Sequence, residues 1–333
     1  MVKWNTVLVV GAGASAEYGF PLGSGLMEEI RTTLSEVLDG SVNPEFIKAA
    51  NIIGISESVL KDNANIPLTG LKLAPSIDRY ISSHSKNEII SKICKLCICW
   101  HILKAERKSS IFYDKISDDY IGGEIADKKW LTYLFKGIVA SSTPSDLETF
   151  FSGLNIISFN YDRCIRHYML KSVSDYFNLK EHEAVEVTRK LKVIHPYGQV
   201  GRLKWEDPAY AKSTANFGAD DADTVARAYN EIITFDEDGS SLSTTHTEVK
   251  GLIAAAQRIV FLGYGFHEQN ERLLTEGISP KCMRIIFTAV GMHPQVWQET
   301  KRIIDQRYNS DNTHVSTEEC SDTMCRMSSL IFG

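Results

Sequence analysis

The sequence predicts an α/β fold, a doubly wound parallel sheet with a large, mostly helical insertion. Five short apolar runs end in small or polar residues. None of them alternates as a half-exposed strand would, so each is expected to be a strand covered on both faces. Helical patterns separate the runs, and strands that alternate with helices are typical of a doubly wound sheet. The expected strands are Thr6–Val10, Asn155–Phe159, Leu191–Ile194, Arg258–Leu262 and Arg284–Thr288.

The spacing of these strands predicts how the chain is organised. After the first strand, apolar residues recur at helical spacing, and a long stretch with helical periodicity and proline turns then delays the second strand. A later stretch, 201–243, is poor in apolar residues and is expected to form loops with a short helix. The last residues are polar and loosely patterned, and they are expected to pack only in an oligomer. We therefore expect a single domain, 1–333, made of a core (1–39 and 145–308), a helical insertion (40–144) and a C-terminal tail (309–333).

Composition excludes several classes of protein. The 333 residues carry a formal charge of -6, whereas a surface that binds nucleic acid or anionic lipid needs a basic excess. No uncharged stretch is long enough for a membrane span, and the apolar run within residues 1–10 leads straight into a glycine, as a core strand does and a signal peptide does not. Seven cysteines, an odd number, fit a reducing compartment. We expect a cytoplasmic protein without direct contact to nucleic acid or membrane.

A glycine turn follows the first expected strand. Gly11 to Ala16 reads Gly-x-Gly-x-x-Ala, which lets the backbone approach a pyrophosphate at the start of a helix; a tight strand–helix turn without a ligand would look the same. The segment Gly19–Gly23 interrupts the helix, and Glu28 and Glu29 fall on a helix instead of at a strand end. The dehydrogenase fingerprint is therefore absent, and so is the Gly-Lys-Ser/Thr of a P-loop.

Polar residues end the later strands, where α/β sheets bind ligands. Asn160 and Asp162 follow the second strand, and they would equally suit an Asx turn or a helix cap. His195 follows the third, where a titratable imidazole would face the same crevice, although a lone histidine is often a surface or core residue. A second glycine turn, Gly263–Asn270, suits a ribose or adenine group and is also an ordinary way to begin a helix.

Taken in order, these segments resemble the sirtuin-like (SIR2) family, which has a Rossmann-like sheet. The residues that carry the resemblance are Gly11–Ser15, Gly19–Pro21, Phe159–Asp162, His195 with Gly198, and Gly263–Gly265. The resemblance implies a catalytic set and a set that binds NAD+. The implied catalytic residues are Asn160, His195 and Asp162. The implied NAD+-binding residues are Gly11, Ala12, Gly13, Ser15, Phe20, Pro21, Gly263, Tyr264 and Gly265.

The chain departs from the deacetylase sirtuins at two places. Those enzymes carry two Cys-x-x-Cys pairs for zinc after the catalytic histidine, and here only Cys282, Cys320 and Cys325 follow His195. The sequence also lacks the Asp-Phe-Arg that follows the proline in their loop. The chain therefore looks like the zinc-less NADases of bacterial antiphage defence, such as the component of HerA-type systems. We expect no zinc and read the upstream cysteines, Cys94, Cys97 and Cys99, as apolar core residues.

A segment of the expected insertion looks like one that is common in this defence branch. It is Ser76–Tyr80, which would also serve as a helix cap, and the sequence leaves the role of its Asp78 open.

The resemblance implies that NAD+ is the substrate and that no cofactor is needed. Asn160 would bind the nicotinamide ribose and position water, Asp162 would bind the carboxamide, and His195 would act as general base. The products would be nicotinamide and ADP-ribose. A protein deacylase or ADP-ribosyltransferase, and a non-catalytic nucleotide-binding scaffold, are the alternatives. Because the chain is nearly all catalytic fold, control is expected from homo-oligomerisation or from a partner such as a HerA-type ATPase or a short Argonaute.

Overall fold

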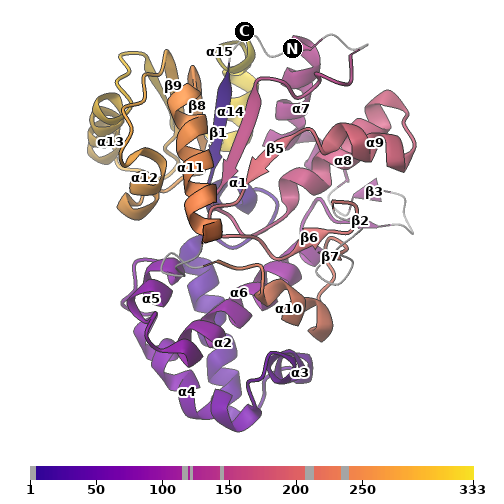
Figure 1. Ribbon diagram of the computed structural model, residues 1–333, viewed down its shortest axis with the longest axis vertical. Coiled ribbons are helices and arrows are strands. Elements are labelled where there is room, and N and C mark those ends of the chain that lie inside the picture. The colour runs from indigo at the N-terminus through magenta and orange to yellow at the C-terminus, as the bar shows by residue number, and fades with distance from the viewer. Residues whose placement is uncertain (1–4, 115–118, 121–122, 143–145, 207–213, 234–239) are drawn as a thin grey trace.

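The computed structural model describes residues 5–114, 119–120, 123–142, 146–206, 214–233 and 240–333. Among these residues the main sheet has six strands, all parallel to their neighbours, in the order β10, β9, β8, β1, β4 and β5 (Figure 1). Their bounds are β1 (Thr6–Val10), β4 (Leu154–Ser158), β5 (Lys192–Ile194), β8 (Arg258–Leu262), β9 (Arg284–Thr288) and β10 (Thr313–Ser316). Two small two-stranded pairs lie outside it: β2 (Tyr113–Asp114) with β3 (Asp119–Tyr120), and β6 (Arg202–Leu203) with β7 (Thr214–Ala215).

The strand order confirms the predicted Rossmann-like α/β class. The chain adds β4 and β5 on one side of β1 and then β8, β9 and β10 on the other, which is the order of doubly wound dinucleotide-binding sheets. The topological switch point therefore lies between β1 and β8. Val10 is level with Ser158 on one neighbour and with Leu262 on the other. Residues that follow these three strands consequently meet at one edge of the sheet.

All five predicted strands are present, and β1 and β8 are buried along their whole length. Continuous apolar character marks them because helices cover both faces of the sheet. In Figure 1, α11 (Ser240–Ala255) lies in front of the sheet and α14 (Cys320–Arg326) behind it. The other helices around the sheet are α1 (Ala12–Ala16), α7 (Trp130–Ser141), α8 (Cys164–Phe177), α9 (Glu181–Thr188), α12 (Glu268–Thr275), α13 (Pro294–Arg307) and α15 (Ser328–Phe332).

A second group of helices forms a lobe next to the carboxyl edge of the sheet (Figure 1), and we call it the helical lobe. Helices α2, α4 and α6 pack on one another in it, and α3, α5 and α10 surround them. Its members are α2 (Gly23–Asp39), α3 (Pro44–Ile52), α4 (Glu57–Gly70), α5 (Ile77–Ser83), α6 (Glu88–Lys108) and α10 (Ala222–Tyr229). A 3₁₀ turn, Gly123–Lys128, precedes α7.

The helical lobe differs from the predicted insertion in its membership. Helices α2 and α10 belong to it although the sequence boundaries leave them outside 40–144, and α7 packs with α8, α14 and α15 instead. The proposed boundary at 144 and 145 lies outside the described residues.

The C-terminal tail packs within the chain itself, which differs from the sequence prediction. Residues 309–333 were expected to pack only in an oligomer, but β10 extends the sheet beside β9, and α14 and α15 pack against α7. The Glu17 carboxylate, at the end of α1, also accepts hydrogen bonds from the backbone amide and hydroxyl of Ser321. The strand escaped prediction because β10 is a short edge strand that does not need a continuous apolar run.

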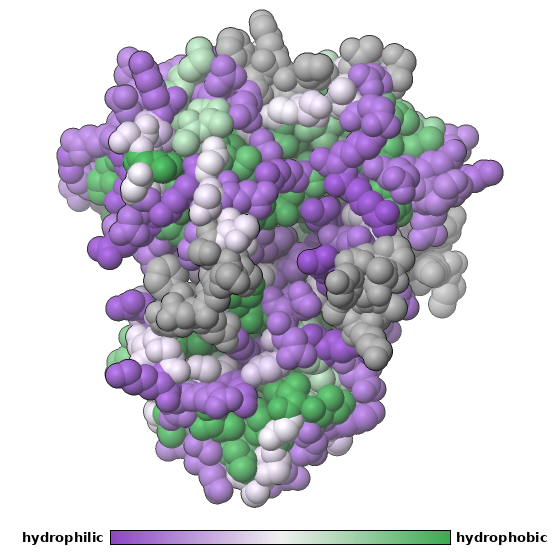
Figure 2. Space-filling model, in the orientation of Figure 1, coloured by the Kyte–Doolittle hydropathy of each residue, from purple (hydrophilic) through white to green (hydrophobic). Residues whose placement is uncertain are grey.

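The surface of the molecule carries both hydrophilic and hydrophobic side chains. Figure 2 shows a mainly hydrophilic face with hydrophobic side chains gathered toward the end of the helical lobe. Exposed large apolar residues of this lobe include Leu38, Ile52 and Leu73. No helix in the described part of the chain is long and apolar enough to cross a membrane.

Candidate functional site

Two glycine turns meet at the switch point of the sheet. One follows β1 and the other follows β8, and they are in backbone contact: the Gly13 amide donates to the Gly263 carbonyl at 3.0 Å. Gly263 has a φ of +56°, in the left-handed region, and a Cβ there would lie 2.1 Å from the Ala14 nitrogen. A Cβ on Gly11 would lie 2.5 Å from the Gly263 oxygen. Both positions therefore require glycine.

Part of the donor capacity of these turns is used within the fold. The amides of Gly11 and Gly13 donate to backbone carbonyls, and the Gly263 amide donates to the Thr288 hydroxyl at 2.8 Å. Among the described residues, no hydrogen-bond acceptor is present for the amides of Ala12, Tyr264 and Gly265, which lie next to these glycines. These amides remain for a ligand. Because α1 has only five residues, its dipole adds little to them.

We expect Gly263→Ala to destabilise the protein by more than about 1 kcal/mol, since both the φ angle and the contact with Ala14 oppose a side chain. Urea denaturation measures the effect. Gly251→Ala is the matched control: a Cβ at Gly251 meets nothing within 4 Å, and the site is inside α11, where alanine is expected to be neutral or stabilising. Equal stability of the two variants would contradict the close packing of the turns.

Asn160 connects the second predicted segment to the first glycine turn. Its side-chain nitrogen donates to the Gly11 carbonyl at 2.9 Å and to the Ser15 hydroxyl at 2.8 Å. The Ser15 hydroxyl in turn donates to the Asp162 carboxylate at 2.6 Å, and the other oxygen of Asp162 accepts from the Cys164 amide. Since both amide protons of Asn160 are used, its side-chain oxygen is the atom left to accept a hydrogen bond from a ligand or water.

His195 lies directly behind Asn160. Its Nδ1 is 2.9 Å from the backbone carbonyl oxygen of Asn160. Because a carbonyl oxygen can only accept a hydrogen bond, Nδ1 carries the proton, and Nε2 is the basic nitrogen of the neutral ring. Burial lowers the pKa of His195 from 6.5 to about 4, while the Asp162 carboxylate acts in the opposite direction. At neutral pH the imidazole is therefore uncharged and able to accept a proton.

A cavity of about 700 Å³ lies over the glycine turns. Its walls come from the ends of β9, β8, β1 and β4, which are neighbours in the sheet, and from the helical lobe at α5. The predicted residues that line it are Gly11, Ala12, Gly13, Asn160, Gly263, Tyr264 and Gly265. Ring contacts with Phe159 and Phe261 hold Tyr264 in place. The volume suits a ligand of dinucleotide size.

Five of the predicted residues do not line this cavity. Ser15, Asp162 and His195 support Asn160 from behind, as described above. Phe20 is buried, and Pro21 lines a smaller cavity between α2 and α6. Their neighbours Leu22 and Gly23 take part in the main cavity instead.

The sequence assigned no role to several residues that line the main cavity, including Lys129, Asp78 and Glu17. Lys129 is the one lysine or arginine among the described lining residues. Its position is fixed by the next residue, Trp130, whose ring nitrogen donates to the Ala14 carbonyl at 2.9 Å. No spacing rule connects this helix start to a glycine turn more than 100 residues earlier, and the aromatic anchor was the one available signal.

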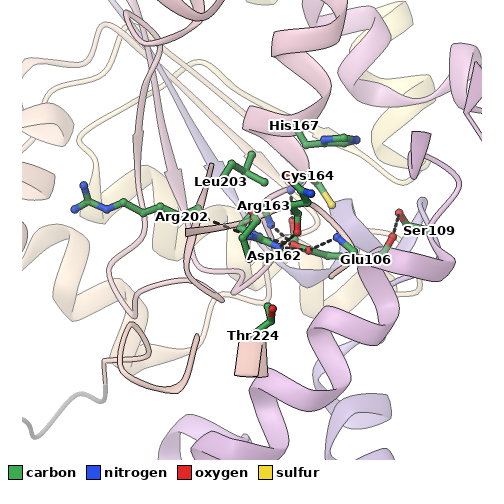
Figure 3. A network of polar contacts seen from close by, with 12 residues as sticks. Glu106, Ser109, Asp162, Arg163, Cys164, His167, Arg202, Leu203 and Thr224 are labelled. Atoms are coloured by element: carbon green, nitrogen blue, oxygen red, sulfur yellow. Dashed lines mark hydrogen bonds and ion pairs between the residues drawn. The ribbon is translucent and has the colours of Figure 1, made fainter. Parts of the chain in front are cut away.

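A buried ion pair fixes the chain just after Asp162. Figure 3 shows the Glu106 carboxylate of α6 facing the Arg163 guanidinium, and both side chains are fully buried. The Arg163 Nε and amide donate to one carboxylate oxygen, and a guanidinium nitrogen donates to the other at 2.5 Å. The Gly218 amide and the carbonyls of Ala215 and Asn216 complete the network. The network joins the helical lobe to the segment that carries Asn160.

The upstream cysteines are buried, as predicted for apolar core residues. Cys94, Cys97 and Cys99 are buried and unpaired in α6, and burial raises the pKa of the Cys94 thiol to about 12. Over the described ranges, no cluster of three or more His, Cys, Asp or Glu residues has an arrangement that could hold a metal ion.

Comparison with known proteins finds only distant structural similarity. No protein-family model and no curated protein sequence matches the chain. Among solved structures, a Sir2 homologue in complex with NAD is 11% identical, with a TM-score of 0.43, and covers 99% of this chain and 90% of its own. A mutant Sir2 homologue in complex with 2'-O-acetyl ADP ribose is also 11% identical, with a TM-score of 0.41, and covers 98% and 91%. Similarity at this level does not identify a ligand for this chain.

Proposed function

We propose that the chain is an NAD+ hydrolase that cleaves the nicotinamide–ribose bond and releases nicotinamide and ADP-ribose. The observation that supports it most is the position of Asn160. It is held by the Gly11 turn and Ser15, with its side-chain oxygen available, beside a cavity of about 700 Å³ at the switch point of the sheet. The ordered sequence resemblance to sirtuins names NAD+ as the ligand of such a cavity.

In the proposed reaction the C1'–N bond of the nicotinamide riboside breaks, and its electron pair stays on the nicotinamide nitrogen. A water oxygen forms the new bond to C1'. Because His195 does not itself line the cavity, one water proton would pass through a relay water to Nε2 of His195 and then to solvent. Asn160 would hold the water or a ribose hydroxyl through its free oxygen. In this scheme Asp162 acts through Ser15, whose hydroxyl it orients. The free amides of the two turns would donate to the pyrophosphate.

An acyl-lysine peptide separates this proposal from the deacylase alternative. We expect the chain, alone or with the protein encoded beside its gene, to release nicotinamide at the same rate with and without the peptide. Release that requires the peptide would instead support a deacylase, and NAD+ binding without any release would support a scaffold.

Lys129 is the proposed counter-charge for the pyrophosphate, because it is the one lysine or arginine among the described lining residues. We expect Lys129→Met to raise the KM for NAD+ by about 10- to 100-fold, the effect of losing one hydrogen bond to a charged group, with a smaller change in kcat. Steady-state kinetics measure it. Lys136→Met, at an exposed position of α7, the helix that Lys129 directly precedes, is the control and should leave KM unchanged. Equal KM values for the two variants would contradict this role of Lys129.

The proposed biological role is antiphage defence by NAD+ depletion, a form of abortive infection. A hydrolase of this kind has to remain silent until it is needed. We propose control by homo-oligomerisation or by a partner chain such as a HerA-type ATPase or a short Argonaute. The exposed apolar residues of the helical lobe support a protein contact there.

A further inference from the structure

One carboxylate enters the cavity from the helical lobe, at the same end as Asn160. Asp78 lies in the first turn of α5, and the Ser76 hydroxyl caps this helix by accepting from the Arg79 amide. The Asp78 side chain lines the cavity, and its Oδ1 accepts a hydrogen bond from the Tyr161 hydroxyl. Tyr161 follows Asn160 in the chain. The carboxylate is therefore connected to the residue next to the one that would hold water.

Asp78 differs from the other carboxylates that line the described part of the cavity. These are Glu17 and Glu319, and Glu17 is already hydrogen-bonded to Ser321 at the start of α14. Glu319 directly precedes that helix. Glu319 follows β10 at the far edge of the sheet, whereas Asn160 follows β4, which is next to β1. Among the carboxylates that line the described part of the cavity, Asp78 is thus the one connected to the segment that carries Asn160.

Burial and hydrogen bonding act in opposite directions on the charge of Asp78. Burial raises the pKa of the Asp78 carboxyl above its usual value, while the Tyr161 hydroxyl and the nearby His267 act in the opposite direction. A carboxylate that water screens poorly interacts more strongly with a positive charge in the cavity. Beyond the hydrogen bond from Tyr161, no other side chain of the described residues donates to Asp78.

We propose that Asp78 is a further catalytic residue, which faces the ribose and stabilises the positive charge that develops there as nicotinamide leaves. This inference rests on the proposed function. In the ground state the positive charge of NAD+ is on the pyridinium ring, and in the oxocarbenium-like transition state it moves to the ribose. A fixed carboxylate beside the ribose therefore binds the transition state more tightly than the substrate, which raises kcat.

If the Tyr161–Asp78 hydrogen bond had only a structural role, substitutions of these two residues would have different effects from those expected for a catalytic Asp78. Asn can accept the Tyr161 hydrogen bond through its amide oxygen, so Asp78→Asn retains the contact between the lobe and the sheet and removes only the charge. Tyr161→Phe removes the contact and retains the charge. If the contact alone mattered, Asp78→Asn would be silent and Tyr161→Phe would be the harmful substitution.

The test compares kcat, KM for NAD+ and thermal stability of Asp78→Asn, Tyr161→Phe and a control. We expect Asp78→Asn to lower kcat by about 10²–10³-fold, the usual effect of removing one preorganised charge-stabilising group, with KM and the melting temperature nearly unchanged. Asp62→Asn makes the same substitution at an exposed position of α4 in the same lobe and should leave all three quantities at wild-type values.

Each outcome decides the inference. Wild-type kcat in Asp78→Asn, or a lower kcat that only follows a lower melting temperature, would overturn the catalytic role and leave the proposed function standing. Loss of kcat in Tyr161→Phe alone would assign the effect to the contact. A wild-type chain that releases no nicotinamide, either alone or with the protein encoded beside its gene, would overturn the proposed function and the role of Asp78 with it.

Discussion

His195→Ala is expected to slow the proposed NAD+ hydrolysis by about 10²–10⁴-fold, the share that a general base contributes. The reason is that Nε2 is the basic nitrogen of a neutral ring whose Nδ1 is bound to the Asn160 carbonyl. Nicotinamide release under saturating NAD+ measures the loss. A twofold loss would contradict the role of His195 as general base.

His195→Asn is the matched variant. Its side-chain amide can donate to the Asn160 carbonyl as Nδ1 does, but it offers no base. We expect it to be as inactive as His195→Ala and more stable to heat. Recovery of activity in His195→Asn would mean that His195 only positions Asn160.

The low pKa of His195 also sets the sign of the pH dependence. The neutral imidazole is the form that the proposed role requires, and burial lowers the pKa of His195 to about 4. The contribution of His195 to the rate is therefore fully present at neutral pH and is lost only as the pH falls through about 4. A kcat profile that fell near pH 6.5, the pKa of an unperturbed histidine, would contradict the buried environment of the ring.

Glu106→Ala has the largest expected effect on stability. It leaves the buried Arg163 guanidinium without its carboxylate, and breaking a buried pair in this way costs about 3–5 kcal/mol of the free energy of unfolding. Urea denaturation measures the loss. Because Arg163 immediately follows the Asn160–Asp162 segment, we also expect NAD+ hydrolysis to fall.

Two controls identify the cause. Glu57→Ala removes an exposed pair with Lys61 on α4 and is expected to change stability by less than about 1 kcal/mol. Replacing Glu106 and Arg163 together by methionine should recover part of the loss, because no buried charge is then left unpaired. A single Glu106→Ala variant as stable as Glu57→Ala would show that the pair does not hold the lobe to the sheet.

The sequence predicted the sheet well where strands are buried on both faces. β1 and β8 are continuous apolar runs because helices cover them, so their bounds were predicted to the residue. β10 was missed since an edge strand needs no such run. The helical lobe was only partly foreseen, because α2 and α10 come from separate parts of the chain and their packing partners depend on the tertiary fold.

The candidate site was predictable at the strand ends and not elsewhere. Parallel strands bring their carboxyl ends together, so Gly11, Asn160 and Gly263 could be grouped without a structure. Asp78 and Lys129 reach the same cavity from the helical lobe and from the start of α7. Their placement depends on the Tyr161 hydroxyl and the Trp130 ring, which are contacts that no local spacing encodes.

The central claim is that this cavity binds NAD+ and that water accepts the ribose. The most direct test is to incubate the full chain with NAD+, alone and with the protein encoded beside its gene, and to quantify NAD+, nicotinamide and ADP-ribose together. We expect NAD+ loss to be matched one to one by nicotinamide and by ADP-ribose in at least one of the two mixtures, and to disappear in Asn160→Ala. Unchanged NAD+ in both mixtures, or equal loss with Asn160→Ala, would contradict the account.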